Sequence, residues 1–179
     1  MVILINNWLS ESIFHDHLKL ARVTPIYKDE DKKQFCNYRP ISVLNSFSKI
    51  YETVLKNRLL SFLDQHNILY LHQYGFRKNH SSYMPIISLI DYITDHLENG
   101  MYTVSVFLDF KKAFDSINHD ILLYKLNHYG IRGAAYDLIK DYLTNRLQQI
   151  IYNNVLSKYQ KIETGVPQGS RTPLFSYLY

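Results

Sequence analysis

Asp109 is the strongest candidate for a metal-binding carboxylate in this sequence. It lies near the end of YTVSVFLDF (residues 102–110), a segment rich in β-branched and aromatic residues that predicts a buried strand. A carboxylate held at a strand end can ligate a divalent cation in a fixed direction, but a turn or capping role is more common there. Two-metal phosphoryl transfer needs at least two carboxylates, holding cations about 4 Å apart. The other candidates lie on or near predicted helices, where capping or solvent exposure explains them equally well: Asp115, Asp120, Asp137 and Asp141.

Basic residues in two irregular segments could bind phosphate. Arg39 lies in NYRPIS (residues 37–42), where the following proline disfavours helix and leaves the guanidinium on an extended chain. Arg77 and Lys78 lie in QYGFRKNHSS (residues 73–82), a polar loop. Taken alone, Arg39 is better explained as an ordinary surface arginine, whereas Arg77 and Lys78 are explained equally well as solvated loop charges.

The segment GVPQGS (residues 165–170) combines two glycines with a stiff proline and a hydrogen-bonding glutamine. Such a segment can bring backbone close to a ligand. It lacks the spacing of a phosphate-binding P-loop, however, and a plain tight turn accounts for it equally well.

The elements that must position these residues form an α+β pattern. The stretch up to Leu20 has no clean period. Strands are predicted at residues 21–27, 102–110, 148–152 and 155–159, the last two joined by a tight turn at Asn153 and Asn154. Helices are predicted at residues 46–65, 84–99, about 120–129 and 134–144, with Gly100 and Gly130 ending the second and third.

Bulk composition fits one folded domain. The 179 residues are 46% apolar and 20% charged, with no linker-like stretch. A net charge of +4 favours an anionic partner only weakly. The single cysteine, Cys36, excludes an internal disulfide, and no disulfide-linked partner is expected. The lack of a possible internal disulfide fits an intracellular protein best, in the nucleus or the cytoplasm. No targeting or membrane segment is predicted.

Six strings, taken in order, resemble the reverse transcriptases of non-LTR (LINE-type) retrotransposons. They are ARVTPIYK, NYRPIS, QYGFRK, VFLDFKKAFDSINHDILLYKL, GIRG and GVPQGS, and they cover roughly residues 21–170. The resemblance implies an α+β right-hand polymerase. Residues 1–179 would form a single partial domain, with about 21–100 fingers-like and about 101–179 part of the palm.

The same resemblance implies roles for residues near the predicted palm strand. Asp109 would be the catalytic carboxylate that binds Mg²⁺, with help from the Phe110 carbonyl. Phe114 matches the bulky position that packs on the incoming deoxyribose and excludes a ribose 2′-hydroxyl.

Further matches imply nucleotide and template contacts. Arg39 and Lys28 match positions that hold the triphosphate of the incoming dNTP. Gln168 and Gly169 match a contact with nucleotide and template strand. Arg77 and Lys78 match a segment that lies along the RNA template.

The chain also departs from the family pattern. Residues 171–179 (RTPLFSYLY) differ from the usual xLGPLLF continuation, and the sequence contains neither a YxDD hairpin nor a thumb. The leading expectation is an RNA-directed DNA polymerase domain, with RNA template, DNA primer and dNTP as partners, that is inactive as this polypeptide alone. A non-catalytic nucleic-acid-binding remnant is the alternative. An unrelated α+β domain survives only if the motif series is accidental.

Overall fold

A computed structural model describes residues 2–77, 79–109 and 113–169. The fold is mixed α and β, and the chain divides into two compact units. The first unit combines Met1–Ser61 with Lys112–Tyr179, and the second is Phe62–Lys111. The division into fingers-like residues (about 21–100) and palm residues (about 101–179) follows from the family resemblance, not from these compact units, and it stays a prediction.

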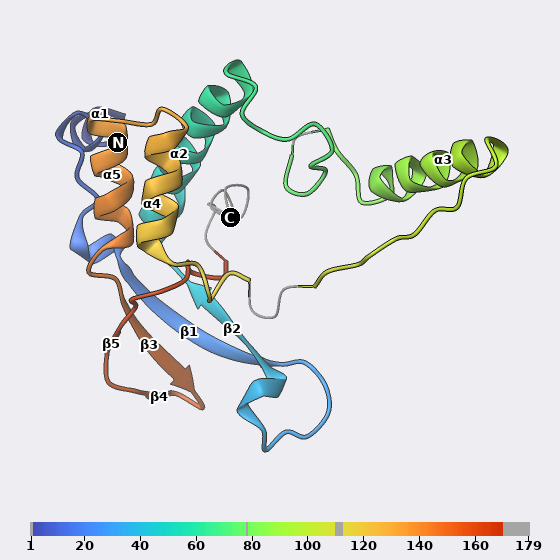
Figure 1. Cartoon of the computed structure of the whole chain (residues 1–179). Coiled ribbons are helices and arrows are strands. Elements are labelled where there is room, and N and C mark those ends of the chain that lie inside the picture. The colour runs from blue at the N-terminus through green and yellow to red at the C-terminus, as the bar shows by residue number, and fades with distance from the viewer. Residues whose placement is uncertain (1, 78, 110–112, 170–179) are drawn as a thin grey trace. The chain divides into compact units, whose positions relative to one another are not determined.

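A small mixed sheet organises the first unit (Figure 1). Its strands are β1 (Leu20–Tyr27), β2 (Tyr38–Val43), β3 (Leu147–Tyr152), β4 (Val155–Leu156) and β5 (Gln160–Lys161). The order is β2-β1-β3-β4, with β5 also paired to β3. β1 runs antiparallel to β2 and parallel to β3, so the sheet joins parts of the chain that are distant in sequence.

The strand predictions in this unit are confirmed with changed bounds. β1 matches residues 21–27, and β3 matches residues 148–152. Asn153 and Asn154 adopt φ values of 47° and 62°, as expected for the tight turn between β3 and β4. β4 is shorter than the predicted 155–159, and β2 is a strand where only an extended loop was expected.

Helices α1 (Val2–Glu11), α4 (His119–His128) and α5 (Ala134–Leu143) belong to the first unit, and α5 contacts both α1 and α4. α2 (Ser46–Gln65) begins in the first unit, and its last four residues belong to the second. Asn118 caps α4, because its side chain accepts a hydrogen bond from the Ile121 amide at 3.0 Å. α1 was not predicted, whereas α2, α4 and α5 are confirmed. None of the helices in the described part of the chain has the length and apolar character that a membrane span requires.

The apolar core of the first unit also encloses two cations. Lys19 is 2% exposed, and its Nζ lies 2.9 Å from Asp141 Oδ1. Arg146 is fully buried, with its guanidinium carbon 4.6 Å from the ring centre of Tyr142 and Nη1 donating to the Tyr142 carbonyl at 3.0 Å. Buried charges are tolerated when they are paired or stacked in this way.

The second unit contains α3 (Met84–Glu98), followed by an extended segment at residues 101–109. α3 confirms the predicted helix. The predicted strand at 102–110 is wrong for residues 102–109, which pair with no strand in the described chain; Phe110 lies outside the described residues. Tyr102 is 98% exposed and Val104 is 87% exposed. β-propensity describes how a side chain fits a pleated, half-buried surface, and it supplies neither a partner strand nor a covering layer.

Candidate nucleotide-binding site

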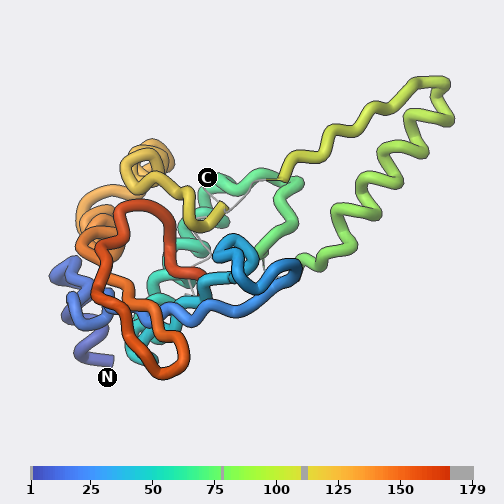
Figure 2. The backbone as a smooth tube through the Cα atoms, turned by 90° about the horizontal axis from the view of Figure 1, so that it is seen from below, coloured from blue at the N-terminus to red at the C-terminus, as the bar shows by residue number. Residues whose placement is uncertain are grey.

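The GVPQGS segment is tied to two other parts of the first unit by backbone hydrogen bonds. The Ser42 amide of β2 donates to the Gln168 carbonyl at 2.7 Å. The Val166 amide donates to the Phe114 carbonyl at 2.9 Å, and the Gly165 amide donates to the Ile117 carbonyl at 2.7 Å. Figure 2 shows the described chain (red end) returning to β2 (cyan). The segment is therefore held in place by backbone that is far away in sequence.

Both described glycines of this segment lie against backbone. Gly165 has φ +79°, and a Cβ added there would lie 2.7 Å from the Asp115 carbonyl oxygen. Gly169 has φ +109°, and its Cβ would lie 2.8 Å from the Ser42 carbonyl oxygen. These positions favour glycine because of both conformation and space. In this structure the two glycines lie close to other backbone of the same chain, at Asp115 and at Ser42.

Asp115 and Gln168 form the polar contact at the centre of this arrangement. Gln168 Nε2 donates to Asp115 Oδ1 at 2.8 Å, and both residues are half-buried. Asp115 does not cap α4, because Asn118 has that role. Nearby, His119 Nε2 lies 2.7 Å from the Gly165 carbonyl oxygen. Since a carbonyl oxygen only accepts, we infer that this ring nitrogen carries a proton.

Asp115 and Gln168 also line a cavity of about 310 Å³ against the sheet. Its wall includes Val23 of β1, Ser42 of β2 and Ile150 of β3. A second cavity of about 660 Å³ shares Val23, Asp115 and Ile150, and it extends to Lys32 and Lys33. Apolar walls with a few placed polar groups are typical of small-molecule sites.

The predicted phosphate ligands lie beside this cavity and do not line it. Arg39 is exposed on β2, opposite Ile26 of β1. The cavity is lined by Pro40 and Ser42, so strand alternation places Arg39 on the opposite face of the sheet. Lys28 directly follows β1, is exposed, and has its Nζ 3.8 Å from Asp29 Oδ2.

Gly169 approaches the face of the sheet that carries Arg39. A Cβ on Gly169 would lie 3.8 Å from Ile41 Cγ2, and Ile41 shares the strand face of Arg39. Phe114 is half-buried in a turn at residues 113–115. The loop at residues 168–169 therefore passes the edge strand β2, with Gln168 beside the cavity and Gly169 beside the face that carries Arg39.

Two of the predicted site residues that the structure describes belong to the second unit. Asp109 is exposed in the extended segment. Arg77 is half-buried, and its Nη1 donates to the Tyr70 carbonyl at 3.3 Å while Nη2 lies 4.0 Å from Asp64 Oδ1. Phe110 and Lys78 lie outside the described residues. The described residues contain no group of three or more His, Cys, Asp or Glu that could hold a metal, and the Mg²⁺-binding role of Asp109 stays a prediction.

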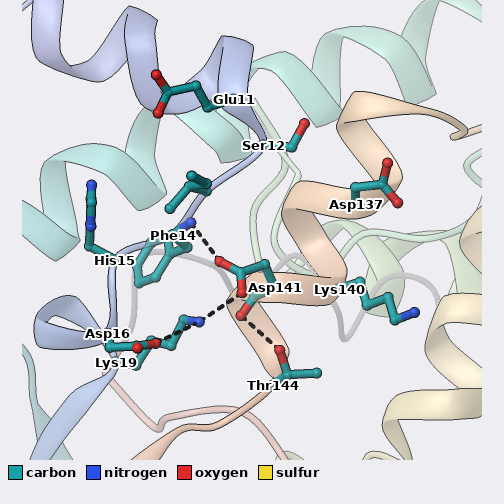
Figure 3. A pocket seen from close by; sticks show the side chains of 11 residues that line it. Glu11, Ser12, Phe14, His15, Asp16, Lys19, Asp137, Lys140, Asp141 and Thr144 are labelled. Carbon is teal, nitrogen blue, oxygen red and sulfur yellow. Dashed lines mark hydrogen bonds and ion pairs between the residues drawn. The ribbon is translucent and has the colours of Figure 1, made fainter.

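A separate charged hollow of about 610 Å³ is lined by the end of α1, by residues 12–19 and by α5 (Figure 3). Its central carboxylate, Asp141, accepts hydrogen bonds from the Phe14 amide at 2.7 Å and from Lys19 Nζ at 2.9 Å. Lys19 also pairs with Asp16 at 3.1 Å. Asp141 therefore has a structural role, which removes it as a candidate partner of Asp109.

Sequence reasoning did not assign Ser42, Asp115 or His119 to this region. Asp115 was considered only as a capping or metal-binding residue, and its partner Gln168 lies 53 positions away. A contact of this range has no local periodicity or cap pattern that could reveal it. The presence of Gln168 within GVPQGS was the only local signal.

The comparisons with known proteins agree on one family. The family described as "Reverse transcriptase (RNA-dependent DNA polymerase)" matches residues 30–175. The chain is 32% identical over 171 residues to the "Probable RNA-directed DNA polymerase from transposon BS" of Drosophila melanogaster, covering 95% of this chain and 19% of that protein. It is 31% identical over 171 residues to the "RNA-directed DNA polymerase from mobile element jockey" of the same organism, with the same two coverages.

A more distant relative is the "Retrovirus-related Pol polyprotein from type-1 retrotransposable element R2" of Popillia japonica. It is 26% identical over 159 residues, which cover 88% of this chain and 22% of that protein. The chain thus spans about a fifth of the length of these relatives.

The chain belongs to the reverse transcriptase family. Its relatives are the RNA-directed DNA polymerases of non-LTR retrotransposons, and it corresponds to a fragment of them.

Proposed function

We propose that these residues form fingers and part of the palm of an RNA-directed DNA polymerase, and that they bind the incoming dNTP during primer extension on an RNA template. The family match over residues 30–175 carries the proposal. The hydrogen bonds that join Gln168 to β2 and to Asp115 support it, because they hold a predicted nucleotide contact rigidly at a cavity wall.

The residue roles follow the family pattern. Arg39 and Lys28 would compensate the charge of the triphosphate, Phe114 would pack on the deoxyribose, and Gln168 and Gly169 would contact nucleotide and template strand. Both cations are exposed on or directly beside the β1–β2 hairpin, so an anionic ligand can reach them.

Asp109 and the Phe110 carbonyl would contribute Mg²⁺ ligands in the intact polymerase, and Arg77 and Lys78 would lie along the template. Mg²⁺ would stabilise the charge that develops during nucleotidyl transfer. Asp109 is exposed, and the described residues contain no group of three or more His, Cys, Asp or Glu that could hold a metal, so no metal-dependent step is assigned to this polypeptide alone.

Titration of the purified chain with dTTP tests the nucleotide site. We expect Arg39→Ala and Gln168→Leu each to weaken binding by about fivefold or more, since each removes a hydrogen-bonding partner. Arg132→Ala is the matched control, because Arg132 is an exposed arginine between α4 and α5. Equal affinities for the wild type and all three variants would contradict the proposed site.

Primer extension tests the catalytic limit. With a poly(rA) template, an oligo(dT) primer, dTTP and Mg²⁺, we expect no incorporation by the 179-residue polypeptide. Incorporation that is abolished by Asp109→Asn would show that this polypeptide holds a complete catalytic centre. RNA binding that weakens with salt, without dTTP binding, would favour the non-catalytic remnant instead.

A further inference from the structure

The hydrogen bond between Asp115 and Gln168 fixes the orientation of the Gln168 side-chain amide. A glutamine amide can present either its oxygen or its nitrogen to a neighbour. An ionised carboxylate accepts hydrogen bonds and cannot donate them, so the amide atom 2.8 Å from Asp115 Oδ1 is assigned as Nε2. The Gln168 Oε1 atom is thereby left as the acceptor for another group.

Backbone contacts hold the main chain of both Asp115 and Gln168 in place, so neither residue can easily move away from the other. The Gln168 carbonyl is held by the Ser42 amide at 2.7 Å. On the other side, Gly165 lies so close to the Asp115 backbone that no Cβ would fit. Because both main chains are fixed, the orientation of the Gln168 amide depends on the side chain of Asp115.

We propose that Asp115 is a positioning residue that holds the Gln168 amide with Oε1 as the free acceptor, and so sets the affinity of the site for a nucleotide hydroxyl or amino donor. Asp115 acts through Gln168 and does not itself need to touch the nucleotide. This inference rests on the proposed function for its ligand, although the hydrogen bond can be tested without one.

Asp115→Asn is the informative change, because asparagine keeps the size of the side chain but can donate as well as accept. The amide of Gln168 is then free to turn over. Asp120→Asn is the matched control, since it removes an exposed carboxylate from the first turn of α4. Circular dichroism of each variant verifies that the fold is retained.

The first measurement follows the side-chain amide resonances of Gln168 in ¹⁵N-labelled protein, assigned by their loss in Gln168→Leu. We expect Asp115→Asn to shift these resonances and to bring their solvent exchange closer to that of an exposed glutamine. Asp120→Asn should leave them unchanged. Unchanged Gln168 resonances in Asp115→Asn would overturn the positioning role, whether or not nucleotide binds.

The second measurement is a double-mutant cycle with dTTP as the ligand. We expect Asp115→Asn alone to weaken binding by about fivefold, the size expected for one hydrogen bond, and to have less than about a twofold effect in the Gln168→Leu background. Equal effects in both backgrounds would overturn the inference. An absence of dTTP binding by the wild type would instead overturn the proposed function and the ligand part of this inference, while the amide resonances would still decide whether Asp115 orients Gln168.

Discussion

Gly165 marks the closest approach between the GVPQGS segment and the turn at residues 113–115. Its φ of +79° and the 2.7 Å separation between an added Cβ and the Asp115 carbonyl are independent obstacles to any other residue. The glycine also donates its amide to the Ile117 carbonyl at 2.7 Å. A single residue thus determines how closely the Gln168 loop can lie against Asp115.

Gly165→Ala should therefore destabilise the first unit by about 1–3 kcal/mol, combining a left-handed backbone with a backbone clash. Gly133→Ala separates the two effects, because Gly133 also has a positive φ of +57° but a Cβ there meets nothing within 4 Å. We expect Gly133→Ala to show the conformational cost alone. Urea unfolding of the two variants and the wild type measures the difference, and equal losses would show that the chain near Asp115 adjusts freely.

At the scale of elements, local signals predicted helices α2 to α5 and the hairpin turn. The amphipathic period found α2, and Asn153 and Asn154 identified the turn between β3 and β4. α1 was missed because its apolar residues have no clean period, and the joining of β1 to β3 was missed because parallel pairing leaves no mark in either segment. Gln168 was predicted as a site residue, whereas Asp115 needed the fold to bring it into contact.

The segment at residues 102–109 shows the limit of strand propensity. It alternates polar Thr103 and Ser105 with apolar Val104 and Val106, as a half-buried strand would. In the described chain it has no partner strand, and its apolar side chains are exposed. The alternating pattern is therefore typical of a strand, but residues 102–109 form none in the described chain.

Hydrogen exchange should show the difference directly. We expect the amides of residues 103–109 to exchange as fast as those of an unstructured peptide, because they lack strand hydrogen bonds, whereas amides of β1 within the β2-β1-β3 part of the sheet should be protected. The measurement is native-state exchange followed by mass spectrometry at two protein concentrations. Protection of 103–109 at both concentrations would mean that the segment pairs within the chain, and protection only at the higher one would indicate pairing between copies.

At the scale of the whole molecule, the first unit depends on two stretches of chain that are separated by the second unit. Parallel pairing of β1 with β3 and the ion pair between Lys19 and Asp141 join these stretches. Tyr51 of α2 is fully buried beside Phe14, and the Phe14 ring in turn contacts Tyr142, which comes from the other stretch. The packing around Tyr51 therefore reports on the assembled unit.

Burial raises the pKa of Tyr51 to about 12 from its ordinary value of 10.0, with Arg58 lowering it and Asp141 raising it to smaller extents. A raised pKa means that the folded state favours the neutral phenol. The associated stability is fully present below pH 10 and is lost as the pH rises toward 12, by up to about 2–3 kcal/mol.

Tyr51→Phe should remove this part of the alkaline loss of stability, because phenylalanine does not ionise. At neutral pH the variant should lose only about 1 kcal/mol, the usual net value of one hydrogen bond, since the Tyr51 hydroxyl donates to the Ile13 carbonyl at 3.3 Å. Tyr102→Phe is the control, because Tyr102 is exposed and its change should leave the alkaline loss intact. Urea denaturation of the three proteins from pH 8 to pH 12 measures their free energies of unfolding. It tests whether ionisation of Tyr51 causes part of the alkaline loss of stability. Parallel pH profiles for all three would mean that Tyr51 ionises as readily in the folded state as in the unfolded chain, and that the aromatic cluster does not exclude water.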